Sequence, residues 1–422
     1  MLPVFPGAQG FGSHTIAGRY GQIIHVTNLN ADGPGSLKEA LQTTGPRHVI
    51  FDISGVITIK DNILISEPFL TVSGQTSPDE GITIFGAGLT ISTHDVLIQH
   101  LHVRPGGDPD GPDFEVRDAI ELRGSEDDSF EVYNVVVDHC SMSWGADETF
   151  STWYPGVHDV TLSNSIVGES LDDVGHPKGK HSKGLLVGDH TRRFSILSNL
   201  ILHNDDRNPH VKGDATALIA NNLVYNYGRW PLTVFDNKLD KSGPSLVSAI
   251  KNTFIAGPDS PPEHSTVLIS RTMTDGTVIY LEDNKAKDTD PTDPCALATL
   301  EDNDSQCISS EPNVMVSPLQ LLPVDEVEEH VLSHVGALPN TRDAIDTRLV
   351  NDVQTRSGKI IDHHRDVGGA PVYSSTTRAL SPPDNPHDDP DQNGYTNLEE
   401  WIHTFPKQIE HLERKSIQRK AK

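Results

Sequence analysis

Short apolar runs recur along the middle of the chain, and each later run is followed by a polar residue at the same place. The runs are rich in β-branched residues and include HVIFDISG, VVVDHCSMSWG, FSILSNLILHN and LVSAIKNTFIAG. Successive polar landmarks lie 23 to 39 residues apart, and five of the seven are asparagine. The landmarks are His100, His139, Asn164, Asn199, Asn222, Asn252 and Asn284. A repeat of variable length with a fixed polar landmark is typical of stacked coils that carry loops of different size.

Stacked coils place equivalent residues one above another, at the strand spacing of about 4.8 Å. Asparagine side chains in such a column hydrogen-bond along it and satisfy the backbone at each turn. Isolated asparagines are also common in turns, but seven aligned landmarks favour a column. The 34 glycines and 29 prolines agree with many short strands and loops. The sequence therefore predicts an all-β fold, a parallel β-helix, in which the usual relation between 422 residues and domain number does not hold.

Four segments are expected along the chain. Residues 1–47 form an N-terminal cap with a strand at 22–30 and a short helix at 36–41, and residues 48–290 form the β-helix core. Residues 291–380 form a loop followed by helices, the second at 341–353, which cover the end or the side of the stack. Residues 381–422 hold a calcium-type loop and a basic tail. Cys295 and Cys307 bracket a polar loop and could form a disulfide in an oxidising compartment.

The net charge of −27 argues against nucleic acid as a partner, because phosphate binding needs a basic face. If such a protein binds an anionic polymer, it needs a local basic groove or a bridging cation. The chain lacks a run of about 18 apolar residues, so no membrane span is predicted. Its start, MLPVFPGAQGFG, has no signal-peptide pattern, so the sequence is expected to be either a cytoplasmic protein or the mature part of a secreted one.

Acidic residues gather on several coils at a similar distance from the landmarks. Asp108, Asp147, Asp172 and Arg207 each lie eight residues beyond a landmark, which predicts three carboxylates and a guanidinium on one face. Clustered carboxylates repel one another unless a cation lies among them, and oxygen ligands select calcium. Any one of these residues alone is more often part of a solvated loop. The cluster as a whole predicts a Ca²⁺ site, with Asp118, Asp147, Glu148 and Asp172 as ligands and Asp173 as a further candidate.

Positive charge is concentrated in one segment of this acidic chain, HPKGKHSKGLLVGDHTRR. The segment holds Lys178, Lys180, Lys183, Arg192 and Arg193, shortly before Arg207. Scattered surface lysines would not gather in this way. The segment therefore predicts a groove that binds an anionic chain.

Five stretches of the sequence resemble the pectate lyases of the first polysaccharide lyase family. They are DAI (118–120), VVVDHCSMSWGADE (135–148), VTLSN (160–164), HSKGLLVG (181–188) and RNP (207–209), and the likeness spans about two-thirds of the chain. The family's fold is a right-handed parallel β-helix, which agrees with the fold expected from the repeats.

The resemblance implies calcium-dependent β-elimination of α-1,4-galacturonan, with Arg207 as the base that removes the C5 proton. Lys183 matches a lysine that binds a substrate carboxylate, and Asp118 and Asp147 match calcium ligands. Arginine normally stays protonated, because its pKa lies above 12. It acts as a base only where calcium acidifies the C5 proton and neighbouring cations disfavour the guanidinium form. The further candidates for substrate binding are Lys178, Lys180, Lys212 and Arg229.

The sequence departs from the family pattern at two positions. Ser151 stands where the pattern has a second carboxylate, so Glu148 or Asp172 is expected to take that part. Lys212 stands where the pattern has a second arginine, which keeps the charge but loses the bidentate guanidinium.

A second motif, DPDQNGYTNLEE, fits the calcium loop of an EF-hand at each ligand position. The predicted ligands are Asp389, Asp391, Asn393, the Tyr395 carbonyl, Asn397 and Glu400. Prolines before the loop break the entering helix, so the motif is half an EF-hand. It predicts a structural calcium site, the alternative being an acidic turn.

Taken together, the sequence predicts a secreted, monomeric, calcium-dependent pectate lyase that acts on an acidic polysaccharide and yields 4,5-unsaturated oligogalacturonides. Two alternatives stay open. A β-helix glycoside hydrolase would need an acid and a base or nucleophile carboxylate, for which Asp147 and Asp172 are candidates. A carbohydrate-binding β-helix without catalysis is the other alternative.

Overall fold

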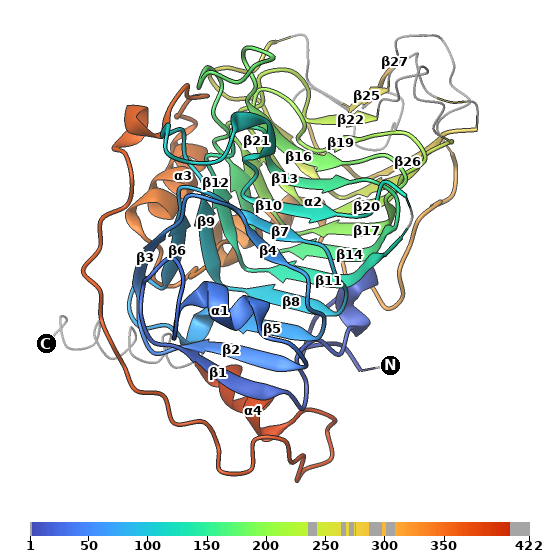
Figure 1. Cartoon of the computed structure of the whole chain (residues 1–422). Coiled ribbons are helices and arrows are strands. Elements are labelled where there is room, and N and C mark those ends of the chain that lie inside the picture. Colours follow the sequence, from blue (N-terminus) through green and yellow to red (C-terminus); the bar gives the residue numbers. More distant parts are fainter. Residues whose placement is uncertain are drawn as a thin grey trace, which may run out of the picture.

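Repeated coils of three short strands form the body of the protein (Figure 1). The computed structural model describes residues 2–127, 129–234, 243–262, 267–269, 274, 276–286, 298–300 and 309–405. In the described part of the chain, each complete coil contributes one strand to each of three sheets, and every strand pairs in parallel with its equivalents in the neighbouring coils. The predicted parallel β-helix is confirmed.

The strands form three parallel sheets. Sheet 1 contains β1 (Gln22–Val26), β2 (Arg47–Phe51), β5 (Leu70–Ser73), β8 (Val96–Gln99), β11 (Val132–Asp138), β14 (Val157–Ser163), β17 (Arg192–Leu197), β20 (Thr216–Ala220), β23 (Leu246–Ile250) and β26 (Val278–Glu282). Sheet 2 contains β3 (Gly55–Thr58), β6 (Ile82–Phe85), β9 (Leu101–Arg104), β12 (Ser141–Ser143), β15 (Ile166–Gly168), β18 (Leu200–Leu202), β21 (Leu223–Tyr225) and β24 (Thr253–Ile255). Sheet 3 contains β4 (Ile63–Ile65), β7 (Leu89–Ile91), β10 (Ile120–Arg123), β13 (Glu148–Trp153), β16 (Lys183–Val187), β19 (His210–Val211), β22 (Leu232–Val234), β25 (Val267–Ile269) and β27 (Ala298–Leu300).

Helical segments are few and short. They are η1 (Phe11–His14), α1 (Leu37–Gln42), η2 (Gly74–Thr76), η3 (Phe114–Val116), α2 (Val324–His334), α3 (Ala344–Thr355), η7 (His364–Val367) and α4 (Asn397–Ile402). None of the helices in the described part of the chain is long and apolar enough to span a membrane.

The interior of the coils is a continuous apolar core. Pairing in sheet 1 aligns Val135 with Val160, Val160 with Phe194, and Phe194 with Ala217, and all four are buried. The β-branched runs fold in this way because each apolar side chain meets its equivalents in the coils above and below. The predicted N-terminal helix is α1, and its Leu37 and Leu41 pack into the same core at the first coils.

The turn between sheets 1 and 2 contains an asparagine ladder. The Nδ2 group of Asn199 donates to Oδ1 of Asn222 at 3.0 Å, Asn222 donates to Asn252 at 2.9 Å, and Asn252 donates to Asn284 at 2.8 Å. Each Oδ1 also accepts the backbone N–H of the preceding asparagine, as Asn222 does from Asn199 at 2.9 Å. The four residues are completely buried, so these hydrogen bonds satisfy polar groups that water cannot reach.

The sequence alignment placed the first three landmarks one residue out of register with this ladder. Strand pairing makes Ser165, not Asn164, equivalent to Asn199, and the Ser165 N–H donates to Oδ1 of Asn199 at 2.9 Å. His100, His139 and Asn164 instead occupy the preceding turn position, with φ of 58°, 48° and 48°. Both turn positions favour small polar side chains, so sequence alone could not separate them.

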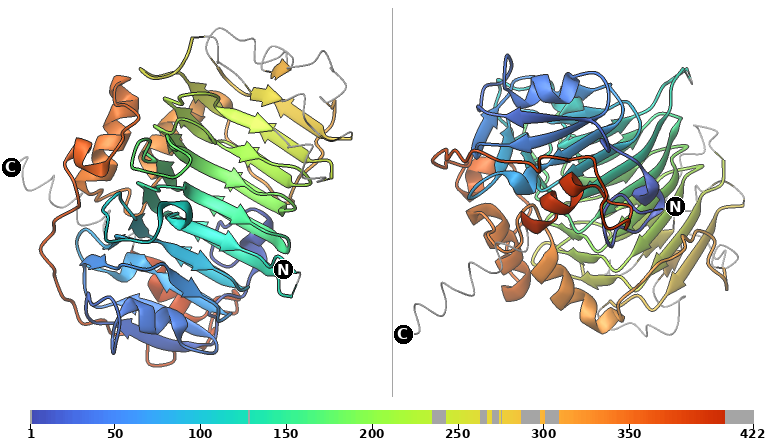
Figure 2. Two further views of the ribbon diagram at one scale, coloured as in Figure 1. Left: turned by 45° about the horizontal axis from the view of Figure 1, so that its top comes forward. Right: turned by 90° about the horizontal axis from the view of Figure 1, so that it is seen from below.

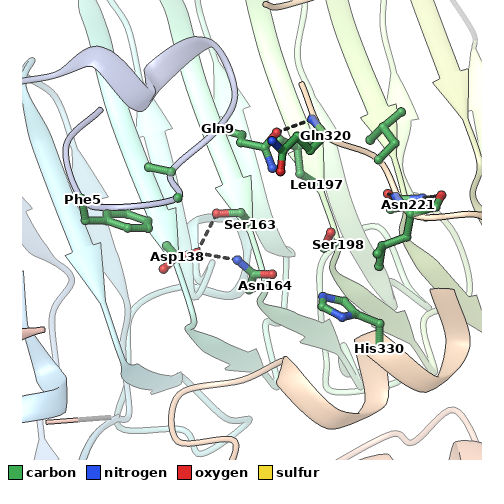
Figure 3. A pocket seen from close by; sticks show the side chains of 14 residues that line it. Phe5, Gln9, Asp138, Ser163, Asn164, Leu197, Ser198, Asn221, Gln320 and His330 are labelled. Carbon is green, nitrogen blue, oxygen red and sulfur yellow. Dashed lines mark hydrogen bonds between the residues drawn. The ribbon is translucent and has the colours of Figure 1, made fainter. Parts of the chain in front are cut away.

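A hollow lies on the outside of this turn, with a volume of about 440 Å³ (Figure 3). On its floor, Asp138 accepts hydrogen bonds from Ser163 Oγ at 2.7 Å and from Asn164 Nδ2 at 2.9 Å. Gln320 and His330 close it from the C-terminal segment. None of the predicted site residues lines it.

Helices α2 and α3 pack along the side of the stack, against sheet 2 (Figures 1 and 2). Val327 and Val331 of α2 and Leu349 of α3 belong to one buried apolar cluster with Leu200 and Leu223. The predicted helix at 341–353 begins later, because Asp343 caps α3 by accepting the Asp346 N–H at 2.8 Å. Of the two predicted locations, the side of the stack is the one observed.

A buried ion cluster joins α3 to sheet 2. The Arg104 guanidinium contacts Asp343 and donates to Asp346 Oδ1 at 2.7 Å, and all three side chains are almost completely buried. Burial alone would raise the pKa of Asp343, but the charge of Arg104 lowers it below its usual range.

The variant Arg104→Leu is expected to lower the free energy of unfolding by about 3–5 kcal/mol, because it leaves two buried carboxylates without their cation. Urea unfolding at neutral pH measures the change. The matched control is Arg356→Gln, which removes an exposed ion pair of 2.7 Å with Glu328 and should cost at most about 1 kcal/mol. Equal effects of the two variants would contradict the structural role of the cluster.

The C-terminal segment returns to the first coils, where α4 lies beside the N-terminal strands (Figure 2). Leu398 and Ile402 pack on Ile50 of β2, and Arg19 donates to Glu399 at 2.8 Å. The proposed disulfide Cys295–Cys307 and the basic tail from residue 406 lie outside the described residues.

Candidate active site

Three of the predicted residues stand in one column at the start of sheet 3. Ile120 pairs with Phe150 and Phe150 with Leu185, so Asp118, Glu148 and Lys183 occupy equivalent positions two residues earlier. Lys183 also forms a parallel bridge with Asp206, directly before Arg207. The coil repeat therefore brings together residues that are as many as 89 positions apart, 118 to 207, in the sequence.

Asp118, Asp147 and Glu148 form a buried cluster of carboxylates. One oxygen from each can be chosen so that all three lie within 4.8 Å of one another. Asp118 is held by two donors, since its Oδ1 accepts the Glu148 N–H at 3.1 Å and its Oδ2 accepts the hydroxyl of Ser151. Ser151, where the family pattern has a carboxylate, thus orients a carboxylate of the neighbouring coil.

The charge in this cluster is not balanced by protein donors alone. Burial raises the pKa of Asp118 well above its usual value, and the nearby carboxylates Asp147 and Glu121 raise it further. The Ser151 hydroxyl and Arg207 act in the opposite direction but do not cancel the rise in this pKa. A site made of crowded carboxylate oxygens fits a hard divalent cation such as Ca²⁺.

Arg207 lies against this cluster, in the turn before β19. Its guanidinium contacts the Glu148 carboxylate, and its backbone has a left-handed φ of 63°. Burial lowers the pKa of Arg207 from its ordinary value, although Asp147 and Asp118 counteract the effect. Glu148 is therefore placed both to complete the carboxylate cluster and to orient the guanidinium.

The other predicted cations differ in their surroundings. Lys183 is mostly buried, with its Nζ 3.2 Å from Asp206 Oδ2 and 3.7 Å from Asp205 Oδ2. Arg229 contacts the same Asp205 through Nε at 3.0 Å. Asp205 and Asp206 thus lie beside Lys183 on the coil that carries Arg207.

Lys212, Lys178 and Lys180 have other surroundings than Lys183. Lys212 pairs with Asp189, and its Nζ lies 5.2 Å from the centre of the Trp153 ring. Lys178 and Lys180 are exposed.

Asp172 does not belong to the group formed by Asp118, Asp147 and Glu148. Its Oδ2 accepts from Lys180 Nζ at 2.9 Å, and its Oδ1 accepts the Ser182 N–H at 3.4 Å. Asp108 likewise lies elsewhere, beside Arg365, His363 and His364. The offset of eight residues failed for these two because loops of different length follow the landmarks on each coil.

Two histidines in contact with the site were not predicted. His181 Nε2 lies 2.8 Å from Asp147 Oδ1, and His176 Nε2 lies 3.5 Å from the same oxygen. Both belong to the lysine-rich segment HPKGKHSK, and the spacing in this segment does not show that its imidazoles reach Asp147.

The EF-hand-like loop adopts a turn followed by a helix. The N–H of Asn393 lies 3.2 Å from Asp389 Oδ1, and that of Gly394 lies 2.9 Å from Asp389 Oδ2. Asn393 Nδ2 donates to Asp391 at 3.0 Å and to Glu400 at 2.8 Å. Asn397 begins α4 and Tyr395 precedes it, as in the exiting half of an EF-hand.

No protein-family model matches the sequence. Known proteins do match the sequence over nearly their whole length. Probable pectate lyase C of Aspergillus flavus is 32% identical over 428 residues, covering 96% of this chain and 94% of that protein. Probable pectate lyase C of Aspergillus fumigatus is 33% identical over 430 residues, with the same coverage of 96% and 94%.

The fold is a parallel β-helix, and the candidate site combines carboxylates and an arginine at the edge of one sheet. The likeness over nearly the whole length of both relatives then shows that this chain belongs to the pectate lyase family of polysaccharide lyases. The solved structure of a pectate lyase bound to a hexasaccharide has the same fold, with a TM-score of 0.52 at 13% identity, and covers 78% of this chain and 96% of that one. The resemblance stated from the sequence is confirmed.

Proposed function

We propose that this protein is a calcium-dependent pectate lyase that cleaves α-1,4-linked galacturonan by β-elimination, with Arg207 as the base. The observation that carries the proposal is the convergence of Asp118, Asp147 and Glu148 within 4.8 Å, next to the Arg207 guanidinium, in a member of this family. Acidic polysaccharide is thus the proposed partner and Ca²⁺ the proposed cofactor.

Asp118, Asp147 and Glu148 would hold the ion, because their oxygens are close together, and because burial and then the neighbouring carboxylates raise the pKa of Asp118. Bound Ca²⁺ supplies charge neutralisation of the uronate carboxylate, which acidifies the neighbouring C5 proton. Arg207 takes that proton, and its lowered pKa favours the neutral form that a base requires. The C5–H electrons form the C4–C5 double bond as the C4–O bond breaks, and the leaving oxygen takes a proton from water.

Lys183 is the proposed partner for a substrate carboxylate, since it is the mostly buried cation in the column of Asp118 and Glu148. Lys212 and Arg229, on the coils of β19 and β22, are proposed to bind further uronate carboxylates, and exposed Lys178 and Lys180 to attract the polymer. Asp172 is not used in this proposal.

A glycoside hydrolase on the same scaffold is less well supported. Hydrolysis needs two carboxyl groups about 5–9.5 Å apart, with the sugar between them. Asp118, Asp147 and Glu148 have oxygens closer together than that. Asp172, the other candidate carboxylate for a hydrolase, is paired with Lys180. A binding protein without catalysis would have no need for an arginine of lowered pKa at the cluster.

Ultraviolet absorbance of unsaturated uronides tests the proposal. Incubation with polygalacturonate and calcium is expected to produce new absorbance, and excess chelator should abolish it. New reducing ends without absorbance would indicate a hydrolase, and binding without product would indicate a carbohydrate-binding protein.

The EF-hand-like loop is proposed as a second, structural calcium site, held by Asp389, Asp391, Asn393, Asn397, Glu400 and the Tyr395 carbonyl. The support is the sequence match together with the turn and helix at the expected places. Since α4 packs on β2, the ion would fasten the C-terminal segment to the first coils.

The variant Glu400→Gln is expected to remove one of two calcium equivalents in calorimetric titration, because the bidentate carboxylate is lost. The thermal midpoint in calcium should fall, while lyase activity at saturating calcium stays within about twofold, since this loop supplies no ligand to the other site. The control is Glu328→Gln, a surface carboxylate of α2, which should leave both equivalents. A single equivalent in the unmodified protein would contradict the second site.

A secreted, monomeric enzyme is the remaining part of the proposal, as expected for an enzyme that degrades an extracellular polymer. Sedimentation of the protein at micromolar concentration checks the monomer.

A further inference from the structure

Two stacked imidazoles point at one oxygen of Asp147. The ring centroids of His176 and His181 are 3.9 Å apart, with planes inclined by only 4°. His181 Nε2 is 2.8 Å from Asp147 Oδ1 and His176 Nε2 is 3.5 Å from it. Both contacts are to Oδ1, the oxygen that takes the hydrogen bond of His181.

The hydrogen positions on these rings follow from their partners. Nδ1 of His176 accepts the backbone N–H of Lys178 at 3.1 Å, so in the neutral ring the hydrogen is on Nε2. At 2.8 Å from a carboxylate oxygen, Nε2 of His181 is likewise the donor.

These positions exclude a transition-metal site at Asp147, His176 and His181, although their atoms are close enough for one. A histidine binds a metal through a nitrogen lone pair. The lone pair of His176 at Nδ1 is already used by the backbone, and its Nε2 carries hydrogen. The pair therefore presents N–H groups to the carboxylate.

We propose that His176 and His181 are positioning residues that hold the Asp147 carboxylate in the orientation in which Oδ2 faces Asp118 and Glu148. This inference rests on the proposed function, since Asp147 is taken as a calcium ligand. His181 fixes Oδ1 by its hydrogen bond. His176, completely buried beneath it, keeps the His181 ring in place by stacking and adds a second N–H beside the same oxygen.

The two stacked imidazoles matter because the Asp147 carboxylate would otherwise be free to turn. Asp147 lies in the short connection between β12 and β13, and its N–H only weakly contacts the Arg117 carbonyl, at 3.4 Å. Asp118, by contrast, is fixed at both oxygens by Ser151 and by the Glu148 N–H. Outer partners that orient metal ligands typically change metal affinity or activity by about 10–100-fold when removed.

The test compares His181→Leu, His181→Gln and His181→Asn, all in the Glu400→Gln background so that only the candidate active site binds calcium. Calorimetric titration without substrate measures the dissociation constant for Ca²⁺. His181→Leu should weaken it by about 10–100-fold. His181→Gln, whose amide N–H reaches the place of Nε2, should recover most of the affinity, whereas the shorter His181→Asn should not.

His25→Leu is the matched control, since His25 forms an equivalent imidazole–carboxylate contact of 2.9 Å with Asp52 on the first coils. It should leave calcium affinity unchanged. Unfolding curves without calcium identify any variant that fails to fold, in which case the Gln and Asn variants decide.

The experiment distinguishes failure of the proposed function from failure of the positioning role. If the Glu400→Gln parent binds no calcium and forms no unsaturated product, the proposed function is overturned. If that parent binds calcium and is active but His181→Leu binds calcium equally well, only the positioning role is overturned. Equal affinities of His181→Gln and His181→Asn would also overturn it, because the role requires a donor at the position of Nε2.

Discussion

Replacement of Arg207 by alanine is expected to lower kcat on polygalacturonate by about 10²–10⁴-fold, the usual contribution of a general base. Calcium binding should persist or become tighter, because the variant removes a cation that contacts the Glu148 carboxylate. The substrate concentration at half-maximal rate should change much less than kcat. Continuous absorbance assays and calorimetric titration measure the two effects on the same preparation.

The appropriate control is Arg193→Ala. Arg193 lies on β17 in sheet 1 and is half exposed, and its Nε donates to Asp159 at 2.6 Å, away from the carboxylate cluster. Its loss should leave kcat unchanged. Substantial residual turnover in Arg207→Ala would mean that another group removes the C5 proton.

Replacement of Asp118 by asparagine is expected to affect the calcium-free and calcium-bound proteins in opposite directions. In the calcium-free protein, burial and the neighbouring carboxylates raise the pKa of Asp118, so the charged carboxylate is less favourable in the folded protein than in the unfolded chain. Asparagine removes that charge and should raise the thermal midpoint in chelator. In calcium the variant should bind the ion at least about tenfold more weakly, because affinity depends on the number of ligand charges.

The pH dependence of the calcium-free protein provides a second check with a defined sign. A carboxyl whose pKa is raised on folding binds its proton more tightly in the folded state, so its contribution to stability declines as pH rises from about 4. The difference in unfolding free energy between Asp118→Asn and the unmodified protein should therefore grow in favour of the variant as pH rises from about 4 to 7. A variant that is less stable in chelator at pH 7 would contradict the crowding of charge at this site.

Much of the fold could be predicted because the repeat has a simple physical cause. Parallel strands in stacked coils need apolar residues at equivalent places and a polar residue at the turn, and both patterns are visible in the sequence. Helix α2 was predicted from its apolar spacing and α3 from its start and stop signals, but the surface of the stack on which they pack was not predicted. That surface is set by Leu200 and Leu223 of sheet 2, whose outward direction depends on the three-dimensional path of the coil.

The candidate site was predictable in part, through the clustering of acids and its likeness to a known pattern. Asp118, Asp147, Glu148, Lys183 and Arg207 were named from the sequence, and the structure places Asp118, Glu148 and Lys183 in one column beside Arg207. The ladder lies one residue away from the predicted landmarks His100, His139 and Asn164, because a left-handed turn residue and a ladder residue look alike in sequence.

Sequence by itself determined the stack, its asparagine turn and which charged residues are candidates for the chemistry, since these depend on residue type and spacing. Only the tertiary structure decided which of them meet. Ser151 orients Asp118 across coils, His181 and His176 lie against Asp147, and Asp172 pairs with Lys180 instead. Such contacts depend on loop lengths and side-chain directions within a few ångströms, which the spacing of residues along a chain does not specify.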